Sequence, residues 1–125
     1  MKRLVAVFIL LTVLIVLSFG GKAFVKETRD ELIELADKAK EAALSNDAKE
    51  LLKYAEKMSA FFEDRHSVLS LYVRHDELEK LSAQLLSLLK QAELEDMDIG
   101  LTLAQIVFTA DHIYERELFS IDNLF

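Results

Sequence analysis

The three histidines are the side chains best suited to chemistry, because each lies near acidic residues at helical spacing. Glu63 and His66 form a Glu-x-x-His pair, a spacing that places both side chains on one helix face as metal ligands. Di-iron helical bundles need two such pairs and two further inward-facing glutamates. The sequence contains no second pair. We therefore interpret His66 as a partly buried, core-facing residue whose ring nitrogens are satisfied locally.

A second candidate cluster combines His75 and Asp76 with His112 and Glu115. His112 and Glu115 are three residues apart, so they share one face of a helix. If folding brings the two histidines together, these side chains could bind a divalent cation or a small ligand. Exposed pairs at this spacing are common, and each is weak. That favours the alternative of surface hydrogen bonds and ion pairs, with Asp76 complementing a helix N-terminus.

The rest of the composition offers no arrangement typical of an enzyme. Cysteine is absent, the serines lie in helical contexts, and no glycine-rich loop could hold a phosphate. We expect neither catalysis nor a bound cofactor. Without Lys2 and Arg3, 13 basic side chains face 22 acidic ones, which gives residues 22–125 a net charge of −9. Such a surface repels phosphate backbones, so nucleic-acid binding is not expected.

The apolar segment Leu4–Phe19 determines where these side chains would lie. Thirteen of its sixteen residues are Leu, Val, Ile or Phe, and none is charged. On an insertion scale they favour the bilayer by about 4–8 kcal/mol. The uncharged stretch continues to Gly21, about 27 Å of helix, which is close to the thickness of a hydrocarbon core. We predict a transmembrane anchor over residues 1–21, with Leu4–Phe19 in contact with the lipid bilayer.

Processing of this segment has two open outcomes. Secretory signals also begin with basic residues and an apolar stretch, and Gly21 and Ala23 have the small side chains that suit cleavage after Ala23. The apolar stretch is at or beyond the usual length of such signals, which favours an uncleaved single-pass anchor in the cell membrane over a secreted protein. Lys2 and Arg3 have no acidic neighbour, so we expect the N-terminus inside and the body extracytoplasmic.

Residues 22–125 have the composition of one acidic helical domain. Proline is absent and glycine occurs only at positions 20, 21 and 100, so little interrupts a helix. Short connections force neighbouring helices to run antiparallel. We therefore predict an all-α protein, in which an N-terminal transmembrane helix precedes an antiparallel bundle of three to four helices. Apolar stripes and acidic caps place helices after the anchor, from Asp47 to about Leu71, from Asp76, and from Asp96 or Asp98.

Both ends of this domain leave a question about helix boundaries. Thr28 to Glu31 fits a capping box, which predicts that the first bundle helix begins there. Alternatively, the anchor helix continues through Gly20 and Gly21 into the same apolar stripe. At the other end, Ser120–Phe125 is expected to leave the last helix and return its apolar residues to the bundle.

The C-terminal half contains two distinctive pieces, LYVRHDEL at 71–78 and DHIYERE at 111–117, and the sequence ends in NLF. With the short anchor and the acidic helical body, they resemble the bacterial family described as domain of unknown function 4363, found largely in spore-forming Gram-positive organisms. The resemblance covers almost the whole chain, although Phe61 and Phe62 stand where that family would have a tryptophan. It implies a membrane-associated helical protein, supplies no activity, and adds weight to His75, His112 and Glu115 as a structural or functional cluster.

Two functional hypotheses follow from these observations. In the first, a membrane-anchored extracytoplasmic bundle acts by protein–protein interaction with an unknown partner. In the second, the bundle binds a small ligand or a divalent metal through His75, His112 and nearby carboxylates.

Overall fold

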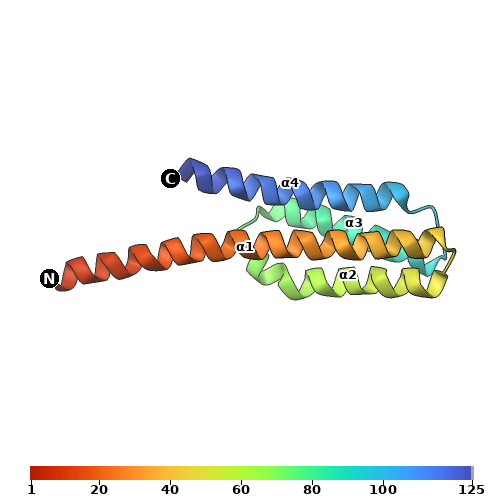
Figure 1. Cartoon of the computed structure of the whole chain (residues 1–125), viewed down its shortest axis with the longest axis horizontal. Helices are drawn as coiled ribbons and strands as arrows, with labels where there is room; N and C mark the ends of the chain where they lie inside the picture. Colours follow the sequence, from red (N-terminus) through yellow and green to blue (C-terminus); the bar gives the residue numbers. More distant parts are fainter. Residues whose placement is uncertain (125) are drawn as a thin grey trace.

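Four helices and three short connections form the described chain, and the last three helices make a bundle with the second half of the first (Figure 1). The computed structural model describes the backbone of residues 1–124 and the side chains of residues 1–115. The helices are α1 (Lys2–Leu44), α2 (Ala48–Leu69), α3 (His75–Glu93) and α4 (Gly100–Leu124). α1 and α3 each pack against α2 and α4, and no diagonal pair approaches closely within the described residues. The predicted all-α antiparallel bundle, preceded by an apolar N-terminal helix, is confirmed.

α1 passes from the apolar segment into the bundle without a break. The helix includes Gly20 and Gly21, so the continuous alternative is confirmed and the predicted helix start at Thr28 is wrong. The Thr28 hydroxyl does not cap a helix; it donates a hydrogen bond to the Phe24 carbonyl oxygen at 2.8 Å, one turn earlier. Glycine weakens a helix by about 1 kcal/mol relative to alanine, a cost small enough for the surrounding apolar turns to offset.

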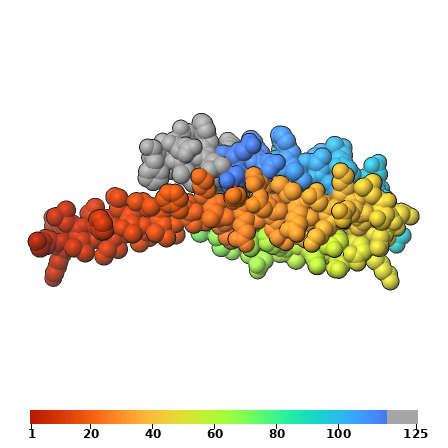
Figure 2. All heavy atoms as spheres, viewed as in Figure 1, coloured from red at the N-terminus to blue at the C-terminus, as the bar shows by residue number. Residues whose placement is uncertain are grey.

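The first half of α1 is largely exposed among the residues that the structure describes. Every residue of Leu4–Phe19 is exposed except Ser18, which is half-buried. Figure 2 shows this segment projecting beyond the packed body. It is the single described helix that is long and apolar enough to span a membrane. Thr12 and Ser18 donate their hydroxyl hydrogens to the carbonyl oxygens of Phe8 and Leu14, both at 2.9 Å, so these polar groups need no water.

The second half of α1 and the other helices bury one stripe each around a shared core. The predicted stripes are confirmed for α1, α2 and α3, and His66 is half-buried as predicted. In α4 the same is true of the predicted inner residues up to Ile113, with Val107 and Tyr114 packed at the margin. The largest fully buried side chains are Phe62, Leu32, Leu51, Met58, Leu78, Leu88, Ile99, Ile106 and Thr109.

The connections between helices follow the predicted signals at one place and depart from them at two. Asp47 caps α2 as predicted, because its carboxylate accepts a hydrogen bond from the Glu50 N–H at 3.2 Å. The predicted cap at Asp76 is wrong: α3 already begins at His75, and Asp76 lies within its first turn. The helix begins before Asp76 because the Leu78 N–H donates a hydrogen bond to the Arg74 carbonyl oxygen.

The start and the end of α4 also differ from the prediction. Neither Asp96 nor Asp98 caps this helix, which begins at Gly100, with the Leu103 N–H donating to the Ile99 carbonyl oxygen. The Asp96 carboxylate instead accepts the Asp98 N–H at 3.0 Å inside the connection. Residues 120–124 remain helical rather than leaving the helix. The predicted packing of the side chains in Ser120–Phe125 lies outside the described residues.

Candidate functional site

The predicted histidine cluster is divided between separate local contacts. His75 is exposed, and its Nε2 lies 2.9 Å from Glu79 Oε1, one turn along α3. Asp76 is exposed and pairs with Arg74, with Nη2 3.3 Å from Oδ2. His75 and Asp76 therefore both pair with residues close to them in sequence, and neither contacts α4 through these pairs.

His112 lies on α4 and faces α3 through Glu77, a residue outside the predicted cluster. Its Nε2 is 3.9 Å from Oε1 of Glu77, whose side chain is mostly buried, while the Phe108 ring stacks on its imidazole with centroids 6.3 Å apart. Glu115 is exposed. Among the described side chains, no three His, Cys, Asp or Glu residues gather closely enough to hold a metal ion. A metal or ligand site at His75, Asp76, His112 and Glu115 stays a prediction.

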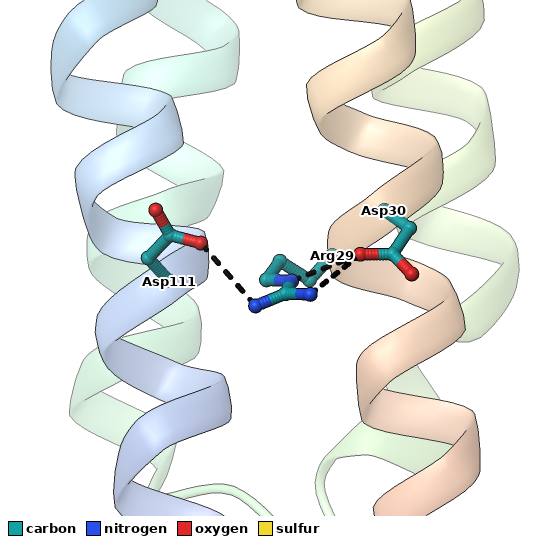
Figure 3. Close-up of polar contacts among 3 residues, drawn as sticks. All are labelled: Arg29, Asp30 and Asp111. Carbon is teal, nitrogen blue, oxygen red and sulfur yellow. Dashed lines mark hydrogen bonds and ion pairs between the residues drawn. The ribbon is translucent and has the colours of Figure 1, made fainter.

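Arg29 on α1 connects the first and last helices just beyond the apolar segment (Figure 3). Its Nη2 lies 2.7 Å from Asp30 Oδ1, and its Nη1 lies 3.7 Å from Asp111 Oδ1 on α4. The guanidinium carbon is 4.3 Å from the centre of the Tyr114 ring. The hydrogen bond that Arg29 donates to the Asp30 carboxylate, followed by the negative charges of Asp30 and Asp111, raises the pKa of Arg29, so this side chain stays cationic.

Arg65 makes the corresponding connection between α2 and α1. Its Nη1 donates to the Thr28 hydroxyl oxygen at 3.3 Å, and its Nη2 donates to Glu27 Oε1 at 3.2 Å. The guanidinium also lies over the rings of Phe24 and Phe61, 5.0 and 4.5 Å from their centres. Cation–π contacts of this kind hold the polar head against apolar surface. Spacing along the chain does not reveal either connection, because Arg29 reaches Asp111 and Tyr114 on α4 and Arg65 reaches Glu27 and Thr28 on α1.

A shallow groove between α1 and α4 is the feature best suited to binding another molecule. Its volume is about 470 Å³, and Ala36, Leu103, Ala104 and Val107 form its apolar lining. Phe108 forms one wall with its side chain largely exposed. The charged residues at the groove are Asp37, Lys40 and Asp111.

The outer face of α4 extends this apolar surface along the helix. Leu101 and Phe108 are 74% and 69% exposed, and the exposed Ala104 lies between them. Residues 101, 104 and 108 share one helix face, separate from the buried stripe that contains Ile106 and Ile113. This second stripe could have been found from the sequence, because its three-and-four spacing is that of an amphipathic face. Apart from Asp37, Lys40 and Asp111, the residues that line the groove are apolar or glycine, which suits the docking of an apolar surface.

Comparison with protein-family models, curated proteins and solved structures finds no match for this chain. The resemblance to the family described as domain of unknown function 4363 therefore stays a prediction.

Proposed function

We propose that this protein is a membrane-anchored helical bundle that binds a partner protein through the groove between α1 and α4. The observation that carries the proposal is the largely exposed pair Leu101 and Phe108 beside that groove. Exposed aromatic and aliphatic side chains next to an apolar depression are typical anchors of protein interfaces. The partner that fits best is an amphipathic helix laid along α4.

The charges around the groove specify the chemistry of that helix. Asp37 and Lys40 are exposed on α1, and Asp111 is half-buried on α4, where it already faces Arg29. The domain beyond the anchor carries a net charge of −9. A partner helix with an apolar face and basic flanks would complement both the groove and its surroundings, and the opposite charges would also accelerate its association.

Placement in the membrane rests on the first half of α1. We propose a single-pass anchor with the N-terminus inside and the bundle extracytoplasmic. Leu4–Phe19 supplies the apolar length, and its two hydroxyl groups bond to the helix backbone. Lys2 and Arg3 precede it without an acidic neighbour, which supports this orientation. With about 1.5 Å per residue, α1 then carries the groove residues Ala36–Lys40 about 25–30 Å beyond Phe19.

Site-specific crosslinking in native membranes tests the proposed interface. A photoreactive benzoylphenylalanine at position 108 should form one major adduct with a second protein. The same group at position 86, on the exposed face of α3, is the matched control and should not form it. Leu101→Glu in the position-108 variant should abolish the adduct. A crosslinked pair of identical chains, or no adduct, would contradict binding of a partner protein at this groove.

The proposed orientation has its own test, because the chain contains no cysteine. Leu44→Cys, at the end of α1 farthest from the anchor, should react with a membrane-impermeant maleimide added to intact cells. Labelling that requires permeabilised cells would reverse the orientation. A labelled protein in the medium that lacks its first 23 residues would instead show a cleaved signal.

A further inference from the structure

The connection between α2 and α3, residues 70–74, lies directly beside the end of the apolar segment. Gly21 is buried because the ring of Tyr72 lies against its α carbon, where a β carbon would overlap that ring. Gly21 is only two residues beyond Phe19, a rise of about 3 Å along α1. The interfacial layer on each side of a hydrocarbon core is about 5–7 Å thick. A bilayer that covers Leu4–Phe19 therefore brings its headgroups to the level of this connection.

The side chains at this level suit a membrane interface. Leu71 is 77% exposed, although it adjoins the half-buried Tyr72. Tyrosine concentrates where hydrocarbon meets water, since its ring is apolar and its hydroxyl is polar. The first charged residues after the anchor, Lys22 and Lys26, are basic, and the exposed Arg74 adds a third cation within the connection. Long basic side chains of this kind reach lipid phosphates while their stems remain apolar.

Several backbone N–H groups of the connection already have hydrogen-bond acceptors within the protein, which suits an environment with little water. The N–H groups of Leu71, Tyr72 and Val73 donate to carbonyl oxygens of Val68 and Leu69 at 2.8–3.1 Å. The Ser70 hydroxyl donates to the Ser67 carbonyl oxygen at 2.6 Å. Backbone donors that are already bonded do not have to be satisfied by water near the hydrocarbon.

We propose that residues 70–74 form a second membrane contact, in which Leu71 and Tyr72 enter the headgroup region beside the anchor. This inference rests on the proposed insertion of Leu4–Phe19. The surface of residues 70–74 adjoins the surface through which that segment would contact lipid. The occupant of this surface is the phospholipid interface itself. The contact fixes the rotation of the bundle about α1 relative to the membrane, because one side of the bundle end is held against the headgroups.

Single-cysteine spin labels in the full-length chain, reconstituted in vesicles of phosphatidylcholine and phosphatidylglycerol, test this proposal. Leu10→Cys reports the anchor, Leu71→Cys the connection, and Leu44→Cys the far end of α1. Leu44 is the matched control because it is also a leucine at a helix connection and is 79% exposed. We expect collisions with a water-soluble nickel chelate to be several-fold rarer at position 71 than at position 44, and rarest at position 10.

The outcomes separate the two proposals. Equal nickel access at positions 71 and 44, with position 10 protected, overturns the second membrane contact and leaves the anchor intact. Nickel access at position 10 overturns the anchor itself. Gly21→Leu provides a second test: displacing Tyr72 should raise nickel access at position 71 while position 10 stays protected. Gly20→Leu should leave both unchanged, since nothing lies within 4 Å of a β carbon there. Circular dichroism checks that each variant remains helical, and an unchanged position 71 in helical Gly21→Leu also contradicts the proposal.

Discussion

The two halves of α1 are both rich in apolar residues, but the first half exposes them and the second half buries them in one stripe. Leu4–Phe19 exposes Leu, Val, Ile and Phe on every side. From Val25 to Ala42 the same helix buries a single stripe and directs charged side chains outward. The backbone is continuous through both halves, so the difference lies in the side chains: Leu4–Phe19 has no charged residue, and the second half has charged residues outside its buried stripe.

The comparison indicates that the two halves of one uninterrupted helix suit different environments. The stripe in the second half is covered by α2 and α4, whereas no described part of the protein covers the first half. A helix that is apolar all round belongs inside a large core or a lipid bilayer, and the bundle is too small to enclose one. The boundary between the two environments is at Gly21 and Lys22, where the first buried residue and the first charge after the apolar segment occur together.

The largest expected effect comes from putting charge into the first half. Replacing both Leu10 and Leu11 by Arg costs about 6–8 kcal/mol of insertion free energy, comparable to the whole apolar gain of the segment. We expect the double variant to be lost from the carbonate-resistant membrane fraction. Glu41→Arg, at an exposed position of the second half, is the control and should remain in it. Retention of the double variant would contradict the anchor.

The next largest effect is a difference in unfolding free energy when the same Leu→Ala substitution is made in each half of α1. Leu32 is 1% exposed and Leu10 is 60% exposed. Leu32→Ala leaves a cavity in the bundle and should lower its free energy of unfolding by about 2–5 kcal/mol. Leu10→Ala changes a largely exposed position outside the buried core and should leave that free energy nearly unchanged. Denaturant titration of both variants in mild detergent measures the difference, and equal losses would mean that the first half also supports the bundle.

A smaller effect is expected at the boundary itself. Gly21→Leu forces the Tyr72 ring away and should destabilise the bundle by about 1–3 kcal/mol through overpacking. A β carbon at the neighbouring Gly20 has no described atom within 4 Å, so Gly20→Leu should stabilise the helix slightly, by up to about 1 kcal/mol. Thermal unfolding of the two variants would show opposite shifts. Similar shifts would contradict the close contact of Gly21 with Tyr72.

The smallest effect concerns the polar contacts just beyond the boundary. Arg29→Met keeps the stem but removes the charge that faces Asp30, Asp111 and Tyr114, and should cost about 1 kcal/mol of stability. Because the pKa of Arg29 is raised in the folded protein, its contribution is complete below the unfolded pKa and disappears only at higher pH. The difference in unfolding free energy between wild type and variant should therefore be constant from about pH 6 to pH 9. A difference that declines within this interval would contradict a permanently charged Arg29.

The features that depend on nearby residues could be predicted from the sequence. The apolar segment, the core stripes and the cap at Asp47 are all local, since each needs only a few neighbouring turns. The continuity of α1 was left open because a capping-box pattern at Thr28 and a mid-helix threonine look alike in sequence. Its mid-helix place depends on α2, whose Arg65 bonds the Thr28 hydroxyl.

The candidate sites were harder to predict because they depend on contacts between distant residues. The pairing of His112 with Glu77 joins α3 to α4, and the contact of Gly21 with Tyr72 joins α1 to a connection fifty-one residues later. The spacing of residues along one helix does not show which residues of other elements they contact. The outer stripe of α4 could have been found, because residues 101, 104 and 108 lie on one face by helical geometry alone.

The unbroken course of α1 also makes it a mechanical lever. From Gly21 to Leu44 the helix is about 35 Å long, so a tilt of about 10° moves its far end sideways by about 6 Å. Transmembrane helices adjust their tilt when the surrounding hydrocarbon becomes thinner or thicker. A chain inserted as we propose would convert a change in bilayer thickness into a displacement of the groove, with no flexible joint along α1 to absorb it.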